Sequence, residues 1–467
     1  MRLFRFLALL APLPVLHVAC VGDDPVASPS PQGDGGASSS SSSSSGGSSS
    51  GDAGSDAPFA TPIQGTVVDS VGVPVAGATV RVEGSAKSVK SDKDGLFALE
   101  APPTYDLTVV HPTSATSTGL ATLAFSGLTT RQPRVQVVFG ATHKATSTTI
   151  TPTGAQGGPL PADGVYAFVF APNNNVRADA ATKYIFTGSS VTMTGPTAFK
   201  WIGEAPFDGV IHGFRYTNDT SEMPTGFQGY GTQSFSIGDG ATTSHSVDLA
   251  TLTSLDRRVE GTVAYGDSAG AAFIYHVRIR GTLGLRFSGR AYTPTSFSLP
   301  FPPNSAMRAA IGASGKRGNA TAGVWKVNIT AAATGAATHA LTIPPELVAT
   351  APAAGALDVD DATTFSWNPL PSPFSTYQVS VTCKEKAGSE YQLVVMTNKT
   401  STKLPNPTAL GVPTSTAKTC TWTVMAIIAP TTNDLVGPAG WGRYVSVDES
   451  LDDGAFSTSA PRDFTLR

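Results

Sequence analysis

Three segments decide the fold of the first folded part of the chain: Ile63-Gln-Gly-Thr-Val-Val-Asp69, Ala78-Thr-Val-Arg-Val-Glu83 and Tyr105-Asp-Leu-Thr-Val-Val-His111. Apolar and polar residues alternate along the second segment and at the start of the third, where Asp106 and Thr108 are the polar ones. A period of two is that of a β-strand with one buried side and one side facing water. These segments therefore predict a small β-sandwich.

Asp92-Lys-Asp-Gly95 lies between two of these predicted strands. Its final glycine can take positive φ without a Cβ clash, which predicts a hairpin turn. A calcium loop is the alternative, but that pattern would put Lys90 at the first ligand position and Ala101 where a bidentate glutamate is needed. The hairpin is therefore the preferred interpretation.

The stretch from about residue 62 to 140 resembles the carboxypeptidase regulatory-like domain, a transthyretin-like sandwich. The residues that match the family pattern are Gly65, Val67, Asp69, Gly72, Pro74, Gly77, Ala78, Val80, Asp92, Asp94, Gly95, Phe97, Tyr105, Leu107 and Val109. The resemblance implies a module that accompanies other activities. It implies no peptidase, because a carboxypeptidase catalytic domain with its zinc ligands has no room in this chain.

The composition of the 467 residues favours an all-β protein with several modules. Charged residues make up 14%, while Gly (48) and Pro (35) are abundant, as expected for short strands and turns. The length predicts about three to four domains of ~100–150 residues each. The net charge of −3 provides no basic field for phosphate, so nucleic acid is not an expected partner.

A repeated pattern predicts that two more sandwiches follow the first. Segments that begin at Phe97, Phe199 and Phe297 each place an aromatic residue before an apolar run that ends at proline. The spacings are 199 − 97 = 102 and 297 − 199 = 98 residues. A period near 100 residues predicts tandem modules over residues 141–252 and 253–342, although both lack the turn motif of the first.

The first 20 residues predict export. Arg2 and Arg5 precede an apolar run that ends in Val18-Ala19-Cys20, and this is a secretory signal too short for a transmembrane helix. The end resembles a bacterial lipobox, which implies lipidation of Cys20 and attachment to the outer membrane or cell surface. His17 stands where that family prefers leucine. The alternative is a periplasmic or secreted protein that is cleaved nearby.

Residues 21–61 predict a disordered tether. They are rich in Ser, Gly, Asp and Pro, and they include an unbroken serine run from Ser38 to Ser45. Such a composition cannot bury enough apolar surface to fold. The segment is expected to display the modules away from the envelope or simply to separate them from lipid.

Residues 343–467 resemble a fibronectin type III-like domain. The likeness rests on a tryptophan in the second strand, Trp367, a third strand led by Tyr377, and a late strand that contains Trp422. It implies that the strands bearing Cys383 and Cys420 are antiparallel neighbours and that both tryptophans are core residues. A disulfide between the two cysteines is expected in an oxidising compartment, with two buried free thiols as the alternative.

Gly266-Asp-Ser-Ala-Gly270 matches the G-x-S-x-G motif of serine hydrolases. That chemistry needs a helix after the turn, whereas the residues from Ala271 to Arg280 predict a strand. A triad histidine would have to be His276 or His339, and neither has supporting context. A hairpin turn is the preferred interpretation, and a divergent serine hydrolase at Ser268 is the less favoured one.

The seven histidines do not form a known metal-binding motif, so no metal or cofactor is expected. His276 alternates with Arg278 and Arg280 along a predicted strand, which indicates a polar stripe facing solvent. No catalytic residues are predicted.

Two tryptophans are the expected ligand contacts, if the protein has any. Trp441 lies in the glycine-rich stretch Gly437 to Arg443, where an exposed ring could stack on a sugar, and Trp201 is the second candidate. The sequence thus predicts a non-enzymatic envelope lipoprotein that presents modules for adhesion, assembly or ligand binding. Expected partners are the membrane, through the lipid, and surface polysaccharide or envelope proteins. A carbohydrate-binding surface protein is the alternative.

Overall fold

The structure is a computed structural model of the chain. It describes the residues 61–69, 72–112, 120–137, 144–172, 177–178, 183–187, 197–202, 206–252, 257–280, 283–288, 292–304, 306–330, 338–384, 390–406, 418–429, 431–437, 440 and 452–466. The described elements are almost entirely β-strands, which confirms the predicted all-β class of sandwich modules.

The first module is a sandwich of seven strands. They are β1 (Thr61–Asp69), β2 (Thr79–Val82), β3 (Ser88–Lys90), β4 (Leu96–Ala101), β5 (Tyr105–Pro112), β6 (Leu120–Leu128) and β7 (Arg134–Val137). One sheet has the order β4-β1-β7, and the facing sheet has the order β3-β2-β5-β6. Alternate side chains such as Val67, Val80 and Leu107 are fully buried between the sheets, as the period of two predicts.

The turn from Asp92 to Gly95 is tight, but the hairpin prediction was wrong. The turn connects β3 to β4, which belong to different sheets and do not pair with each other. Asp92 Oδ1 accepts hydrogen bonds from the N–H groups of Asp94 and Leu96 at 2.9 and 2.8 Å. Gly95 has φ +71°, and a Cβ there would overlap the carbonyl oxygen of Val67. At this turn the chain therefore passes from one sheet of the sandwich to the other.

The second and third modules repeat the strand order of the first. The second contains β8 (Lys144–Thr153), β9 (Gly164–Pro172), β10 (Arg177–Ala178), β11 (Lys183–Thr187), β12 (Thr197–Ile202), β13 (Phe207–Asn218), β14 (Pro224–Ile237), β15 (Thr242–Asp248) and β16 (Ala250–Thr251). The third contains β17 (Arg258–Ala264), β18 (Ala269–Arg280), β19 (Leu283–Phe287), β20 (Ser296–Pro300), β21 (Arg308–Arg317), β22 (Ala320–Ile329) and β23 (Thr338–Thr342). The orders β12-β8-β15 and β20-β17-β23 correspond to β4-β1-β7, and β11-β9-β13-β14 and β19-β18-β21-β22 correspond to β3-β2-β5-β6.

The aromatic residues of the sequence repeat occupy the same place in all three modules. Phe97, Phe199 and Phe297 lie on β4, β12 and β20, the antiparallel neighbours of each first strand. In the first and third modules the phenylalanine pairs with a glycine, Gly65 or Gly261, where a Cβ would lie 2.3–2.6 Å from the ring. Glycine leaves the space into which the ring packs.

The C-terminal domain is a fourth sandwich. Its strands are β24 (Ala349–Ala351), β25 (Ala356–Val359), β26 (Thr364–Trp367), β27 (Thr376–Lys384), β28 (Glu390–Thr397), β29 (Ser401–Lys403), β30 (Lys418–Ile427), β31 (Gly454–Thr458) and β32 (Arg462–Leu466), with one short helix, α1 (Thr432–Leu435). One sheet has the order β24-β26-β29; in the other, β28, β27 and β30 are neighbours and β32 pairs with β30. In the part of the chain that is described, no helix is long and apolar enough to cross a membrane.

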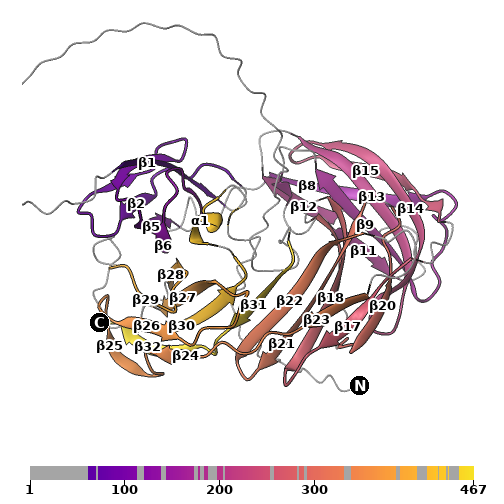
Figure 1. Ribbon diagram of the computed structural model, residues 1–467. Helices are drawn as coiled ribbons and strands as arrows, with labels where there is room; N and C mark the ends of the chain where they lie inside the picture. The colour runs from indigo at the N-terminus through magenta and orange to yellow at the C-terminus, as the bar shows by residue number, and fades with distance from the viewer. Residues whose placement is uncertain are drawn as a thin grey trace, which may run out of the picture.

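The four sandwiches form one assembly in which each packs on at least one other. Figure 1 shows the first module beside the C-terminal domain, with the second and third modules together on the other side. A single 14-stranded sheet joins three of them, because β22 pairs with β31 and β28 pairs with β6. The second module packs on the third through a shared apolar cluster that includes Val169, Phe214 and Phe287.

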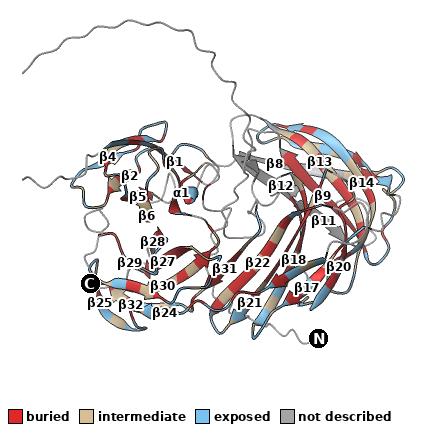
Figure 2. Ribbon diagram, viewed as in Figure 1, coloured by how far each residue is buried: buried red, intermediate tan, exposed pale blue. Residues whose placement is uncertain are grey.

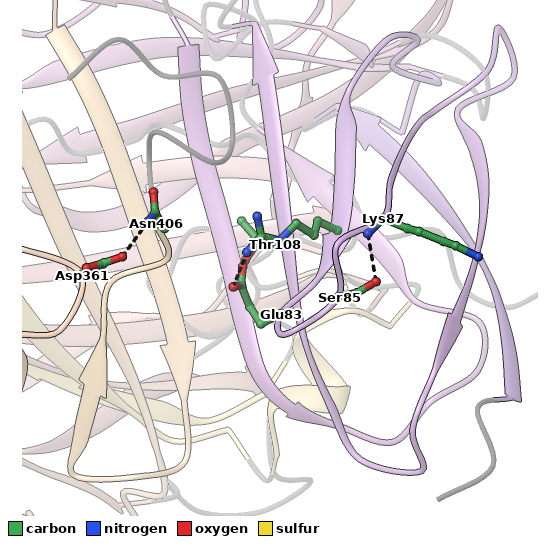
Figure 3. Close-up of polar contacts among 7 residues, drawn as sticks. Glu83, Ser85, Lys87, Thr108, Asp361 and Asn406 are labelled. Carbon is green, nitrogen blue, oxygen red and sulfur yellow. Dashed lines mark hydrogen bonds and ion pairs between the residues drawn. The ribbon is translucent and has the colours of Figure 1, made fainter. Parts of the chain in front are cut away.

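Two predictions about solvent-facing residues were wrong because strands in this assembly have both sides covered. His276 and Arg278 on β18 are each 1% exposed, and so the predicted polar stripe is buried at these two positions. Thr108 on β5 is fully buried, and its hydroxyl donates a hydrogen bond to Glu83 Oε1 at 2.6 Å (Figure 3). Figure 2 shows buried residues on the strands where the modules meet, including β22. An alternating pattern indicates a solvent-facing side of a strand only where no other part of the protein covers that side of the sheet.

Candidate functional site: the seam between the first module and the C-terminal domain

The contact between the first module and the C-terminal domain is built from distant parts of the chain. We call it the seam and define it as β6, β28 and residues 431–437, which include α1. The strands β6 and β28 run parallel, with register pairs from Ala121 and Gln392 to Phe125 and Met396. The seam therefore joins residues more than 260 positions apart.

An apolar core continues across the seam. Met396, Ile427, Ala429, Leu435 and Val436 of the C-terminal domain are all at most 1% exposed, and they belong to the same buried cluster as the core of the first module. Burying apolar surface contributes about 25 cal/mol per Å². The first module and the C-terminal domain therefore share one continuous apolar core.

The helix α1 is oriented toward the first module by its own cap. Thr431 and Asp434 form a capping box, with Asp434 Oδ2 accepting from the Thr431 N–H at 2.9 Å and from its hydroxyl at 2.7 Å. The cap fixes the next residue pair, Thr432 and Asn433, against β6 and the loop that follows it.

Asn433 supplies the main polar contact of this helix. Its Oδ1 accepts hydrogen bonds from the backbone N–H groups of Thr129 and Thr130 at 2.8 and 3.0 Å. Thr432 Oγ1 donates to the carbonyl oxygen of Ser126 at 2.9 Å. These bonds give the backbone groups at and just after the end of β6 partners in the C-terminal domain.

Two further contacts extend the seam at its ends. The Arg134 N–H on β7 donates to the carbonyl oxygen of Val436 at 2.7 Å. At the other end, the hydroxyls of Thr122 and Tyr391 are hydrogen-bonded at 2.5 Å. Burial raises the pKa of Tyr391 to about 12, so its hydroxyl stays protonated at neutral pH. The contacts across the seam described here are thus apolar packing and hydrogen bonds, with no ion pair among them.

The predicted disulfide is formed in the C-terminal domain. Cys383 on β27 and Cys420 on β30 are direct register partners, their Cα atoms lie 4.0 Å apart, and both are buried. Trp367 and Trp422 are 3% and 1% exposed and belong to the same apolar cluster, as the prediction of core tryptophans requires.

The remaining predicted site residues do not meet in the described structure. Cys20 and Trp441 lie outside the described residues. Trp201 is on β12, in register with Lys144 of β8 and Ala178 of β10. A ligand contact at either tryptophan stays a prediction from the sequence.

Ser268 lies in a turn between β17 and β18, which belong to different sheets, so the predicted hairpin was wrong here too. A strand follows the turn, as predicted from the sequence. The Ser268 side chain packs against Gly315, and its Oγ has no hydrogen-bond partner. His276 is buried in the middle of β18. Across the described ranges, no three His, Cys, Asp or Glu residues gather in a way that could hold a metal ion.

A small depression lies beside the disulfide. Its lining includes Cys383, Tyr391 and Leu404, and Asp360 and Asp361 also border it. Asn406 Nδ2 donates to Asp361 Oδ2 at 2.6 Å (Figure 3). Because the lining is mostly apolar, the depression has few groups that could orient a ligand.

The residues of the seam were missed from the sequence, although a signal exists. The run Ala121-Thr-Leu-Ala-Phe125 on β6 and the run Leu393-Val-Val-Met396 on β28 do not alternate. A continuous apolar run indicates a strand covered on both sides. Such runs identify strands buried within an assembly, but they do not identify the partner.

Comparisons with known proteins identify the first module. A family model described as the carboxypeptidase regulatory-like domain matches residues 62–158, a span that extends past β7 into the first strand of the second module. No curated protein matches the chain.

Two solved structures are similar in part. The Bacillus anthracis TIE protein shares 10% identity at a TM-score of 0.15, over 61% of this chain and 50% of that one, so this chain spans about half of its length. A streptococcal ancillary pilin shares 10% identity at a TM-score of 0.16, over 69% of this chain and 96% of that one.

Proposed function

We propose that this protein is a non-enzymatic envelope lipoprotein that presents a rigid body of four β-sandwiches at the cell surface for adhesion or assembly. The observation that supports the proposal most directly is that each module packs on a neighbour. The seam, the pairing of β22 with β31 and the shared cluster of the second and third modules each fix one contact. A body with fixed internal angles presents its surfaces in a constant geometry.

The N-terminal sequence supports the proposed location at the outer membrane or cell surface. A basic start, an apolar run and Val18-Ala19-Cys20 precede a Ser/Gly-rich stretch, and the first described strand begins at Thr61. Lipid on Cys20 would hold the body at the outer membrane or cell surface, since several acyl chains on one residue anchor stably.

The strand order of the C-terminal domain supports its fibronectin type III-like character. Three strands form one sheet, β24-β26-β29, whereas β28, β27, β30 and β32 belong to the other, which also includes β25 and β31. We infer that the domain acts as a binding or spacing module, as such domains do. Carbohydrate recognition by Trp441 or Trp201 stays a prediction from the sequence.

The proposal is tested by metabolic labelling with a radioactive or alkyne fatty acid in a bacterial host, followed by mass spectrometry of the mature N-terminus. The expected result is a mature chain that begins with acylated Cys20 in the membrane fraction. Cys20→Ser should remove the label and release the protein from the membrane fraction. His17→Leu should keep both the label and the membrane attachment. An unlabelled, soluble wild-type chain would contradict the anchor.

Enzymatic activity needs a separate test, and Ser268 is the residue to probe. A fluorophosphonate reagent should leave the purified protein unlabelled, because the Ser268 hydroxyl has no hydrogen-bonded base. Labelling that disappears in Ser268→Ala would contradict the non-enzymatic proposal.

A further inference from the structure

The two ends of the described chain belong to the same body. The chain enters at Thr61, the start of β1, and the last described strand, β32, ends at Leu466 in the C-terminal domain. The second and third modules occupy residues 144–342 between them in sequence. In space, however, the first module and the C-terminal domain meet directly at the seam.

The entering strand is held on both sides. β1 is the central strand of its sheet, with six antiparallel register pairs to β4 and four parallel pairs to β7. A strand at a sheet edge can be peeled away one hydrogen bond at a time. Tension along β1, in contrast, is resisted by two ladders in succession, the pairs to β4 over Thr61–Thr66 and the pairs to β7 over Thr66–Asp69.

In each of the first three modules, the strand on which the chain enters pairs in parallel with a strand at or near the end of the module. These are β1 and β7 in the first module, β8 and β15 in the second, and β17 and β23 in the third. Tension along the chain pulls the start of one strand and the end of its parallel neighbour in opposite directions. The bonds of that ladder are then sheared as a group, which requires more force than separating them in turn.

A hydrogen-bonded route connects the first module to the last strand. From β6 it passes through β28, β27 and β30 to β32, each paired with the next. Cys383 and Cys420 link two strands of this route covalently. No strand of the second or third module takes part in it.

We propose that the protein bears tension between its N-terminal segment and its C-terminal strand, and that the seam is a clasp that keeps this load off the second and third modules. The inference deepens the proposed function, because a protein anchored at its N-terminal end is pulled from that end whenever its body is bound.

The test is single-molecule force spectroscopy on the full mature chain, held at its N-terminal segment and its C-terminus. The seam should open first, and the unfolding steps of the second and third modules should appear only after that event. Steps from these two modules before the seam opens would overturn the proposal.

Asn433→Ala tests whether the seam is the clasp. The substitution removes the acceptor of two hydrogen bonds, so the first event should occur about tenfold faster at a given force. Thr129→Ala is the matched control, because Thr129 contributes its backbone N–H, and its opening rate should equal that of the wild type. An unchanged opening rate in Asn433→Ala, with both variants folded by circular dichroism, would also overturn the proposal.

A disulfide engineered across the seam shows how far the chain extends when the seam cannot open. Ala121 and Gln392 are register partners and only partly buried, so Ala121→Cys with Gln392→Cys can form a disulfide across the seam. It closes off 392 − 121 = 271 residues, and roughly 900 Å of extension should be lost until reductant is added. Below the first event, wild-type and stapled chains should extend equally. A wild-type chain that extends further than the stapled chain before the first event would show that the seam is already open, and this would overturn the proposal.

The outcome is independent of the lipid experiment. Force measurements use the purified chain and do not depend on Cys20, and fatty-acid labelling does not depend on the seam. Failure of one leaves the other interpretable.

Discussion

At the scale of single residues, the repeat depends on space that glycine leaves for phenylalanine. The first strands of two modules contain Ile63-Gln-Gly-Thr-Val67 and Val259-Glu-Gly-Thr-Val263. In both, the glycine faces a phenylalanine of the neighbouring strand, Phe97 or Phe297. A Cβ at Gly261 would lie 2.6 Å from Phe297 Cζ and would overlap the carbonyl oxygen of His339. The glycine that the two segments share is thus a packing requirement.

Replacing Gly261 by alanine should therefore destabilise the third module. The added methyl meets backbone as well as a ring, so we expect a loss of about 2–3 kcal/mol in the free energy of unfolding. Denaturant titration measures it. Gly238→Ala is the control, since a Cβ there meets nothing within 4 Å. Equal stability of the two variants would contradict this account of the repeat.

A second prediction at this scale concerns His212 on β13. Its Nδ1 lies 2.9 Å from the Tyr230 hydroxyl, and burial lowers the pKa of His212 to about 4. In the unfolded chain the pKa is near 6.5, so the unfolded state binds more protons between these values and stability falls as pH drops from about 6.5 toward 4. Allowing for partial exposure, the loss attributable to His212 is about 2 kcal/mol.

His212→Gln should remove that part of the pH dependence. Urea midpoints of both proteins from pH 7.5 to 4 provide the comparison. Burial also lowers the pKa of His111, so some dependence on pH will persist in the variant. A variant profile parallel to the wild-type profile over the whole range would contradict the role of His212.

At the scale of elements, a disulfide links the paired strands β27 and β30, which are separated in sequence by β28 and β29. The disulfide closes a loop with a sequence separation of 37 residues. Cross-linking a loop of this size removes about 4 kcal/mol of conformational freedom from the unfolded chain in the chain-entropy model. The bond thus stabilises the domain that holds the seam together.

The double variant Cys383→Ala with Cys420→Ala should unfold at lower denaturant, with a loss of roughly 3–4 kcal/mol for the C-terminal domain. Tryptophan fluorescence reports the transition, because Trp367 and Trp422 are in the core of this domain. The control is the wild type under reducing conditions, which should approach the variant. Identical midpoints with and without reductant would contradict a stabilising disulfide.

At the scale of the whole molecule, contacts between modules matter as much as the modules themselves. A chain of independent sandwiches would be extended, whereas here the first module and the C-terminal domain share one core. For the 407 residues from Thr61 to Arg467, a compact body would have a radius of gyration of about 22 Å, and this arrangement of four modules should give between about 22 and 26 Å.

Small-angle X-ray scattering of a chain beginning at Thr61 tests this prediction. A value of about twice the compact one would describe separated modules and contradict the packing of the modules on one another. Substituting Ala124, a residue of β6 within the apolar cluster of the C-terminal domain, by arginine should increase the radius by opening the seam. Substituting the exposed Ser88 by arginine should not change it.

The sequence by itself determined the all-β class, the sandwich of the first module, the disulfide partners and the period that places Phe97, Phe199 and Phe297 on equivalent strands. These features follow from local alternation, from turn residues and from resemblance to known domains, all of which act within about a hundred residues.

Only the tertiary structure decided that the turns at Asp92–Gly95 and Gly266–Gly270 change sheets, that Thr108, His276 and Arg278 are buried, and that β6 pairs with β28. The physical reason is that a strand's alternation records whether each side is covered, but not by which part of the chain. Contacts between residues more than 260 positions apart depend on how preformed surfaces fit, and no local pattern encodes that fit.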